Sequence, residues 1–210
     1  MTFHVVTLFP NMFESYLGDS ILARAIREKK VTVKFYNPRD FTKDKHRRTD
    51  DRAYGGGPGM VMYAEPILKA VEKVRAKRKK TILFSPSGKL FTNAYAEALT
   101  KTNDVILICG RYEGVDARVK RILKAEELSI GDYVLTGGEL AAMAVIDATS
   151  RRIPGVLGKF ESVEENRVSS SETYTRPETL VYKKKKYCVP KILLSGHHKQ
   201  IEEWKKSRKK

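Results

Sequence analysis

One stretch of the chain has the residue types of a ligand site. Residues 129–139 place Gly131 and the pair Gly137 and Gly138 around a short apolar core. Glycine permits backbone conformations that other residues resist, and it lets a ligand lie against the main chain. The stretch therefore predicts a backbone-lined binding site, although a strand that ends in a Gly-Gly turn has the same composition.

Two further stretches have a similar character. The apolar runs 81–84 and 104–109 lead into the segments 85–88 and 110–114, which are rich in glycine, serine and proline. A third apolar run lies within 129–139 itself. Strands that end in such loops place them at one edge of a parallel sheet, where open α/β sheets bind ligands. The three loops are therefore expected to line one site.

Other chemistries lack the residues that they need. No G-x-G-x-x-G opens a helix after a strand, and no Gly-Lys-Ser/Thr follows the glycines of 54–60, so neither a dinucleotide site nor a Walker A loop is indicated. No G-x-S-x-G elbow is present, and Cys109 at a strand end is expected to be a small buried residue. The histidines have no partners at metal-ligand spacing, and no metal site is predicted. They are His4, His46, His197 and His198.

The charge balance indicates the class of partner. Lys and Arg number 41 against 25 Asp and Glu, a formal net charge of +16. Such an excess attracts polyanions, so nucleic acid is the leading partner. Part of the charge lies in the irregular segment 39–62, where basic residues run into a glycine-rich end. That segment is typical of a phosphate-binding loop, or of a solvated flexible one.

Cysteine usage and apolar runs bear on the compartment. Only Cys109 and Cys188 are present, which suits a reducing cytosol. The N-terminus lacks the pattern of a signal peptide, and no apolar run reaches the length of about 20 residues that spans a bilayer. A cytoplasmic protein is expected.

Hydrophobic periodicity predicts an α/β fold. Strand, helix and strand open the chain, and helices then alternate with short apolar strands. This pattern favours a mostly parallel sheet with helices on both faces. The expected strands are 3–9, 31–36, 81–84, 104–109 and one within 129–139, and the expected helices are 20–30, 64–74, 93–100, 116–125 and 140–149.

The character of the chain changes after residue 149. A polar segment rich in Ser and Glu reaches about residue 175 and predicts a linker or a mobile lid. Beyond it come a lysine run between Tyr182 and Tyr187 and an expected helix over 197–206. The predicted organisation is a ligand-binding domain over 1–158, a linker or lid over 159–175, and a short helical segment over 176–210.

Five blocks of the sequence form a recognisable set, namely 50–60, 109–114, 129–139, 150–158 and 174–178. Together they resemble the bacterial tRNA (guanine-N1)-methyltransferase family, whose order they follow. The resemblance extends over nearly the whole chain.

The resemblance implies more than the residues alone predict. It implies a knotted methyltransferase of the SPOUT type that works as a homodimer, with each active site built from both subunits. The implied reaction moves a methyl group from S-adenosylmethionine to N1 of the guanosine immediately 3′ of the tRNA anticodon, with magnesium assisting. General topology rules would not predict a knot. The implied cofactor residues fall in the three predicted loops and are Leu83, Phe84, Ser85, Pro86, Gly110, Tyr112, Glu113, Ile130, Gly131, Tyr133, Leu135, Gly137 and Gly138.

The implied reaction needs a base and a cation. Guanine N1 carries a proton that a base must remove, and a cation must stabilise the charge that gathers on O6. Arg151 matches the family's catalytic arginine. The family's aspartate base aligns with Asn166, whose amide cannot accept the proton. Glu165 is the first substitute, unless the shorter lid shifts the alignment. The other candidates are Glu161, Glu164 and Glu172, with Glu113 to hold the substrate base or a metal ion.

The C-terminal part departs from the family as well. The family continues into further helices of a tRNA-binding domain, so 176–210 is expected to be a truncated tRNA-binding segment. Its lysines suit contacts with phosphates, or they are simply solvated. Two alternative functions stay open: a tRNA-binding relative without catalysis, suggested by Asn166, and a knotted methyltransferase acting on another RNA, suggested by the short C-terminus.

Overall fold

A computed structural model describes residues 1–76, 79–157 and 172–208. The chain divides into two compact units, Met1–Leu157 and Gly158–Lys210. Each unit is described by itself. No helix in the described residues is both long enough and apolar enough to cross a membrane.

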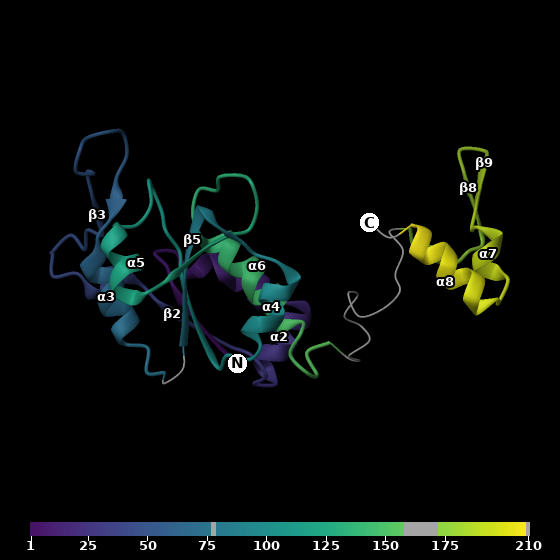
Figure 1. The fold of residues 1–210 in the computed structure, drawn as a ribbon, viewed down its shortest axis with the longest axis horizontal. Coiled ribbons are helices and arrows are strands. Elements are labelled where there is room, and N and C mark those ends of the chain that lie inside the picture. Colours follow the sequence, from purple (N-terminus) through teal and green to yellow (C-terminus); the bar gives the residue numbers. More distant parts are fainter. Residues whose placement is uncertain (77–78, 158–171, 209–210) are drawn as a thin grey trace. The chain divides into compact units, whose positions relative to one another are not determined.

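A parallel five-stranded sheet forms the centre of the first unit (Figure 1). Every neighbouring pair of its strands is parallel, which confirms the parallel α/β sheet predicted from the hydrophobic pattern. Both faces of the sheet are covered, so strands such as β6 are apolar almost throughout. In sheet order the strands are β2 (Thr32–Tyr36), β1 (Thr2–Val6), β6 (Asp104–Ile108), β5 (Lys79–Leu90) and β7 (Glu126–Ser129).

Helices lie on both sides of this sheet, as predicted. Helices α3 (Ala64–Glu72) and α5 (Ala117–Leu123) cover one face, and α2 (Ser20–Arg27), α4 (Asn93–Leu99) and α6 (Glu139–Ser150) cover the other (Figure 1). Alternate residues of β6 enter two separate cores because successive side chains of a strand point to opposite faces. Val105 and Leu107 join one core, and Ile106 and Ile108 join the other.

Two predicted strands have different limits. The first ends at Val6 rather than at residue 9, because Thr7 Oγ accepts a hydrogen bond from Phe9 N, and Pro10 starts a 3-10 helix, η1 (Pro10–Phe13). A short helix, α1 (Glu14–Leu17), follows. The strand expected within 129–139 is β7, which ends at Ser129. Residues 130–138 are therefore almost entirely loop.

The sequence predicts a loop at the end of a strand over 85–88, and this prediction is wrong. The segment lies within β5, where Leu128 of β7 is the partner of both Phe84 and Lys89. The residues between those two partners therefore bulge out of the sheet before pairing resumes. The irregular segment 39–62 also contains structure, namely η2 (Pro38–Phe41) and the antiparallel pair of β3 (Asp50–Asp51) and β4 (Val61–Met62).

The second unit contains a hairpin and two helices. Strands β8 (Thr179–Tyr182) and β9 (Lys185–Cys188) pair antiparallel, and α7 (Lys191–Leu194) and α8 (His198–Ser207) follow. The helix α8 confirms the one expected over 197–206. The lysine run forms the hairpin turn, with Lys183 and Lys184 at positive φ (47° and 63°) as in a type I′ turn. No strand was predicted there, because lysine is depleted in strands.

Candidate functional site

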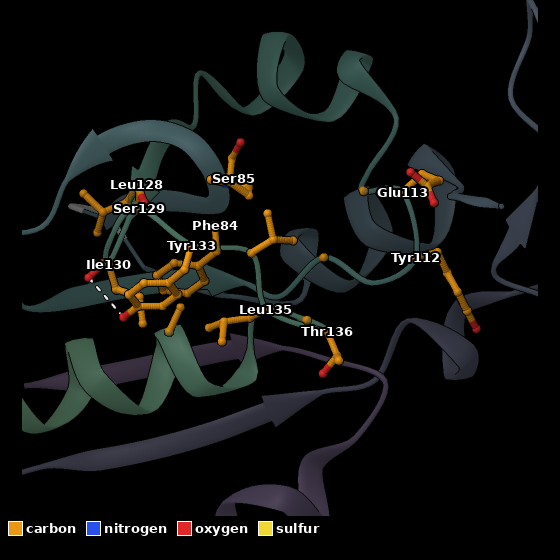
Figure 2. Close-up of a pocket in the computed structure, with 17 residues that line it drawn as sticks. Phe84, Ser85, Tyr112, Glu113, Leu128, Ser129, Ile130, Tyr133, Leu135 and Thr136 are labelled. Carbon is orange, nitrogen blue, oxygen red and sulfur yellow. Dashed lines mark hydrogen bonds between the residues drawn. The ribbon is translucent and has the colours of Figure 1, made fainter. Parts of the chain in front are cut away.

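A pocket of about 230 Å³ lies in the first unit at the ends of β6 and β7 and beside the bulge of β5 (Figure 2). The structure brings the three glycine-bearing loops together here. All the residues implied as cofactor-binding line this pocket except Leu83 and Gly131. The full lining is Phe84, Ser85, Pro86, Gly110, Tyr112, Glu113, Gly114, Leu128, Ser129, Ile130, Tyr133, Val134, Leu135, Thr136, Gly137, Gly138 and Ala141.

One end of the pocket is apolar and contains the side chains of Phe84 and Tyr133 (Figure 2). The Tyr133 hydroxyl donates a hydrogen bond of 3.4 Å to the Ile130 carbonyl. The Tyr133 ring lies over Gly131, where a Cβ would approach Tyr133 Cε1 to 2.2 Å. Gly131 therefore supports Tyr133 from outside the lining. Leu83 is also outside it, because its side chain packs into the core that contains α3 and α5.

The other end of the pocket carries Tyr112 and Glu113 (Figure 2). Glu113 N donates to the Met60 carbonyl at 3.0 Å, and Met62 N donates to the Gly114 carbonyl at 2.9 Å. The Glu113 side chain packs on Gly59, where a Cβ would lie 2.6 Å from Glu113 Cγ. The glycine-rich end of the basic segment 39–62 is therefore attached to the pocket.

A buried ion pair lies beside the pocket lining. Glu139, the first residue of α6, is 1% exposed, and its Oε2 lies 3.0 Å from Arg111 Nη2. Thr7 Oγ donates to Glu139 Oε1 at 2.8 Å. Arg111 and Glu139 lie within the stretches 110–114 and 129–139 that are expected to form the site, but the sequence assigned neither residue a role of its own. A glutamate that opens an otherwise apolar helix was the available signal, since a buried carboxylate needs partners.

Cys109 lies next to this pair and is 1% exposed. Burial, together with the negative charge of Glu139, raises the pKa of the Cys109 thiol well above its usual range. The thiol therefore stays protonated and unreactive. This confirms that Cys109 is a small buried residue rather than a nucleophile.

Arg151 lies at the opposite end of α6 from the pocket. It is the C-cap of this 12-residue helix, whereas Gly138 at the N-cap lines the pocket. At a rise of 1.5 Å per residue, the two ends are about 18 Å apart. The structure therefore does not bring Arg151 to the pocket of its own chain.

The other predicted catalytic residues have separate placements. Glu165 and Asn166 lie outside the described residues, as do Glu161 and Glu164. Glu113 lines the pocket. Glu172 belongs to the second unit, where Tyr174 Oη and Arg208 Nη1 donate to its carboxylate at 2.9 and 2.7 Å.

No cluster of three or more His, Cys, Asp or Glu side chains suited to a metal ion occurs among the residues that the structure describes. His4, for example, is buried and is hydrogen-bonded to Tyr36 Oη at 3.0 Å and to Asp104 Oδ1 at 2.9 Å.

An exposed, largely apolar face runs along α6. Its residues repeat at helical spacing and are Leu140, Met143, Ala144, Asp147 and Arg151, all exposed or half-buried. The exposed residues Phe9, Met12 and Tyr16 extend it over η1 and α1, since η1 contacts α6 and Tyr16 contacts Asp147. We call these eight residues the α6 face. It begins beside the pocket and ends at Arg151.

The comparisons with known proteins agree with the resemblance. The model of the family described as tRNA (Guanine-1)-methyltransferase TrmD matches residues 1–210. A tRNA (guanine-N(1)-)-methyltransferase of Dictyoglomus turgidum is 50% identical over 206 residues, which are 96% of this chain and 82% of that protein. One from Carboxydothermus hydrogenoformans is 46% identical over 210 residues, 98% of this chain and 81% of that protein. One from Thermomicrobium roseum is 50% identical over 212 residues, covering 98% and 78%. The chain belongs to the tRNA (guanine-1)-methyltransferase family.

Proposed function

We propose that this protein transfers a methyl group from S-adenosylmethionine to N1 of the guanosine immediately 3′ of the tRNA anticodon. The observation that carries the proposal is the pocket at the ends of β6 and β7, found in a chain that matches this methyltransferase family from end to end. The net charge of +16 suits a tRNA substrate.

The pocket fits the cofactor in its chemistry. Phe84, Leu128 and Ile130 offer apolar contacts to a planar base, while the glycines of 110–114 and 137–138 leave main-chain groups within reach of its polar edges. Glu113 places a carboxylate in the lining, which suits a cationic ligand. S-adenosylmethionine, when bound there, supplies a methyl group carried on a positively charged sulfur.

Two protein groups serve the guanine. Arg151, a fixed cation with planar donors, stabilises the negative charge that develops on O6 when N1 loses its proton. Glu165 accepts that proton, in place of the aspartate that the family has at the position of Asn166. Glu161, Glu164 and Glu172 are the alternative proton acceptors, and Glu113 positions the base at the pocket.

The position of Arg151 supports a homodimer with shared active sites. The α6 face is apolar over most of its length, and Ala144 at its middle allows a second helix to approach closely. Across a two-fold axis perpendicular to α6, the helices of two subunits run antiparallel. Arg151 of the partner subunit then lies at the N-terminal end of α6, beside the pocket. The distance of about 18 Å that separates Arg151 from its own pocket is thereby bridged.

Two further features belong to this proposal. The segment 130–138 pairs with the loop 110–114 through an antiparallel bridge between Arg111 and Gly137. The trefoil knot of the SPOUT type that the resemblance implies stays part of the proposal. In the second unit, the exposed lysines of the β8–β9 hairpin suit tRNA phosphates. The magnesium dependence implied by the resemblance stays a prediction.

A methylation assay tests the function. We expect the protein to methylate a tRNA transcript with guanosine 3′ of the anticodon and not a transcript with adenosine there. Binding of tRNA and cofactor without turnover would instead favour a non-catalytic relative, which the presence of Asn166 makes the second candidate. Turnover on both transcripts would refute the proposed specificity.

A further inference from the structure

The buried ion pair of Arg111 and Glu139 has no counterpart in the sequence-based site. We propose that these two residues are positioning residues, which hold the loops 110–114 and 136–138 at the separation that the cofactor requires. The inference rests on the proposed function, because it takes the pocket to be the S-adenosylmethionine site. Neither Arg111 nor Glu139 lines the pocket, so the pair acts through the backbone of the residues that do.

Both side chains of the pair are largely buried. Removing two charges from water costs folding free energy, which their attraction recovers only when further hydrogen bonds satisfy them. The Glu139 side chain is 1% exposed and that of Arg111 is 16% exposed. The hydrogen bond from Thr7 Oγ compensates for the burial of one carboxylate oxygen of Glu139. In the described residues, Arg111 Nε and Glu139 Oε2 have no hydrogen-bond partner, so the attraction between the two side chains is chiefly electrostatic.

The contacts of Arg111 reach the loop that precedes α6 and the residue before η1. Its Nη1 donates to the Thr136 carbonyl at 3.3 Å, and its guanidinium lies 4.6 Å from the centre of the Phe9 ring. Gly138 N donates to the Gly110 carbonyl at 3.0 Å, which joins the same two loops through the main chain. Arg111 therefore connects the loop that follows β6 with the loop that precedes α6.

The glycine pair before α6 is explained by this arrangement. A Cβ at Gly137 would lie 2.4 Å from Arg111 Nε and 2.6 Å from Glu139 Oε2. A Cβ at Gly138 would lie 2.7 Å from Cys109 Cα. Both contacts are far shorter than side chains tolerate, so glycine is required here by the ion pair and the neighbouring strand end.

Glu139→Gln removes the charge and keeps the shape. The amide oxygen can still accept from Thr7 Oγ, but the negative charge that attracts the Arg111 guanidinium is gone. We expect the dissociation constant for S-adenosylmethionine, measured by calorimetry on the full chain, to rise roughly 10-fold or more. The KM for tRNA is expected to stay near the wild-type value, because the pair does not face the substrate.

Gly137→Ala tests the same idea without removing a charge. The new methyl group points at the ion pair and separates it, so the same weakening of cofactor binding is expected. Glu65→Gln is the matched control, because Glu65 pairs with Lys69 on the exposed side of α3. That variant should bind the cofactor as the wild type does.

Thermal unfolding of each variant shows that binding is measured on folded protein. Folded Glu139→Gln and Gly137→Ala proteins with wild-type affinity for S-adenosylmethionine would overturn this inference and leave the proposed function intact. An equal rise in the cofactor dissociation constant and in the KM for tRNA would also overturn it, since that result indicates a general loss of structure. A wild-type protein that binds no S-adenosylmethionine would overturn the proposed function, and this inference with it.

Discussion

Tyr16 Oη donates a hydrogen bond of 2.6 Å to Asp147 Oδ2, one helical turn before Arg151. Residues four apart on a helix are neighbours, so Asp147 is within reach of the Arg151 side chain. In the described residues, Arg151 nevertheless has no side-chain hydrogen bond or ion pair. The Tyr16 phenol thus binds Oδ2 of the carboxylate that is nearest to Arg151 along the helix.

Tyr16→Phe should therefore lower the rate of methyl transfer. Without the phenol, Asp147 is free to pair with Arg151 and to compete with guanine O6. We expect kcat to fall about 2-fold, the amount that corresponds to an exposed helix ion pair. The dissociation constant for S-adenosylmethionine should not change, because Tyr16 is outside the pocket lining. An unchanged kcat would show that Asp147 does not compete for Arg151.

The same hydrogen bond predicts a pH dependence of stability. The bond to Asp147 raises the pKa of Tyr16 from 10.0 to about 12. A raised pKa means that the contribution of the neutral phenol is complete below pH 10 and is lost as the pH rises through about 12. Urea unfolding across this window should show a steeper loss of stability for the wild type than for Tyr16→Phe. Equal slopes would contradict the assignment.

The proton acceptor is tested by a pair of substitutions in 159–175. If Glu165 is the base, Glu165→Gln should lower kcat by roughly 100-fold or more while tRNA and cofactor still bind. Asn166→Asp should restore activity in that background, because it supplies a carboxylate one residue away. A Glu165→Gln protein with the wild-type rate would exclude Glu165 and direct attention to Glu161, Glu164 and Glu172.

Gly59 and Gly57 form a matched pair for the loop beside Glu113. Both have positive φ, 84° and 109°, so alanine is strained at either position. At Gly59 a Cβ also meets the Glu113 side chain at 2.6 Å, whereas at Gly57 it meets nothing within 4 Å. Gly59→Ala should thus impair methyl transfer more than Gly57→Ala does. Comparable kinetic losses in both variants would indicate that Glu113 is not held by Gly59.

The α6 face offers a test of the dimer. Ala144→Glu places a charge at the middle of this face, at a position whose side chain is exposed in the single chain. We expect this variant to remain folded and to sediment as a monomer, and to lose activity while it still binds S-adenosylmethionine. A wild-type protein with the mass of a monomer, or an Ala144→Glu protein that remains a dimer, would refute the face as the interface.

The sequence predicts local features better than distant ones. The parallel strands and the loops that follow them could be predicted, since apolar runs and glycine clusters are adjacent in the chain. The partners of Glu139 could not be predicted, because Thr7, for example, lies 132 residues away. Likewise, the bulge at 85–88 depends on pairing with Leu128 of another strand. The sequence did not predict the β8–β9 hairpin, because its four lysines conceal the alternation of apolar and polar residues that is typical of strands.

The placement of Arg151 shows where resemblance alone falls short. The matching motifs assigned a catalytic role to Arg151 but did not predict where this residue lies relative to the pocket. The length of α6 supplies the position and separates Arg151 from the pocket of the same chain.

That separation has a genetic consequence. If each pocket works with Arg151 of the partner subunit, a Gly137→Ala chain and an Arg151→Ala chain are each defective alone but complement each other when co-expressed. The mixed dimer combines one intact pocket with one intact arginine. Random pairing then leaves about a quarter of all sites functional. If Arg151 served its own chain, the mixture would contain no intact site. The length of α6 therefore predicts complementation between two defective variants of the same gene.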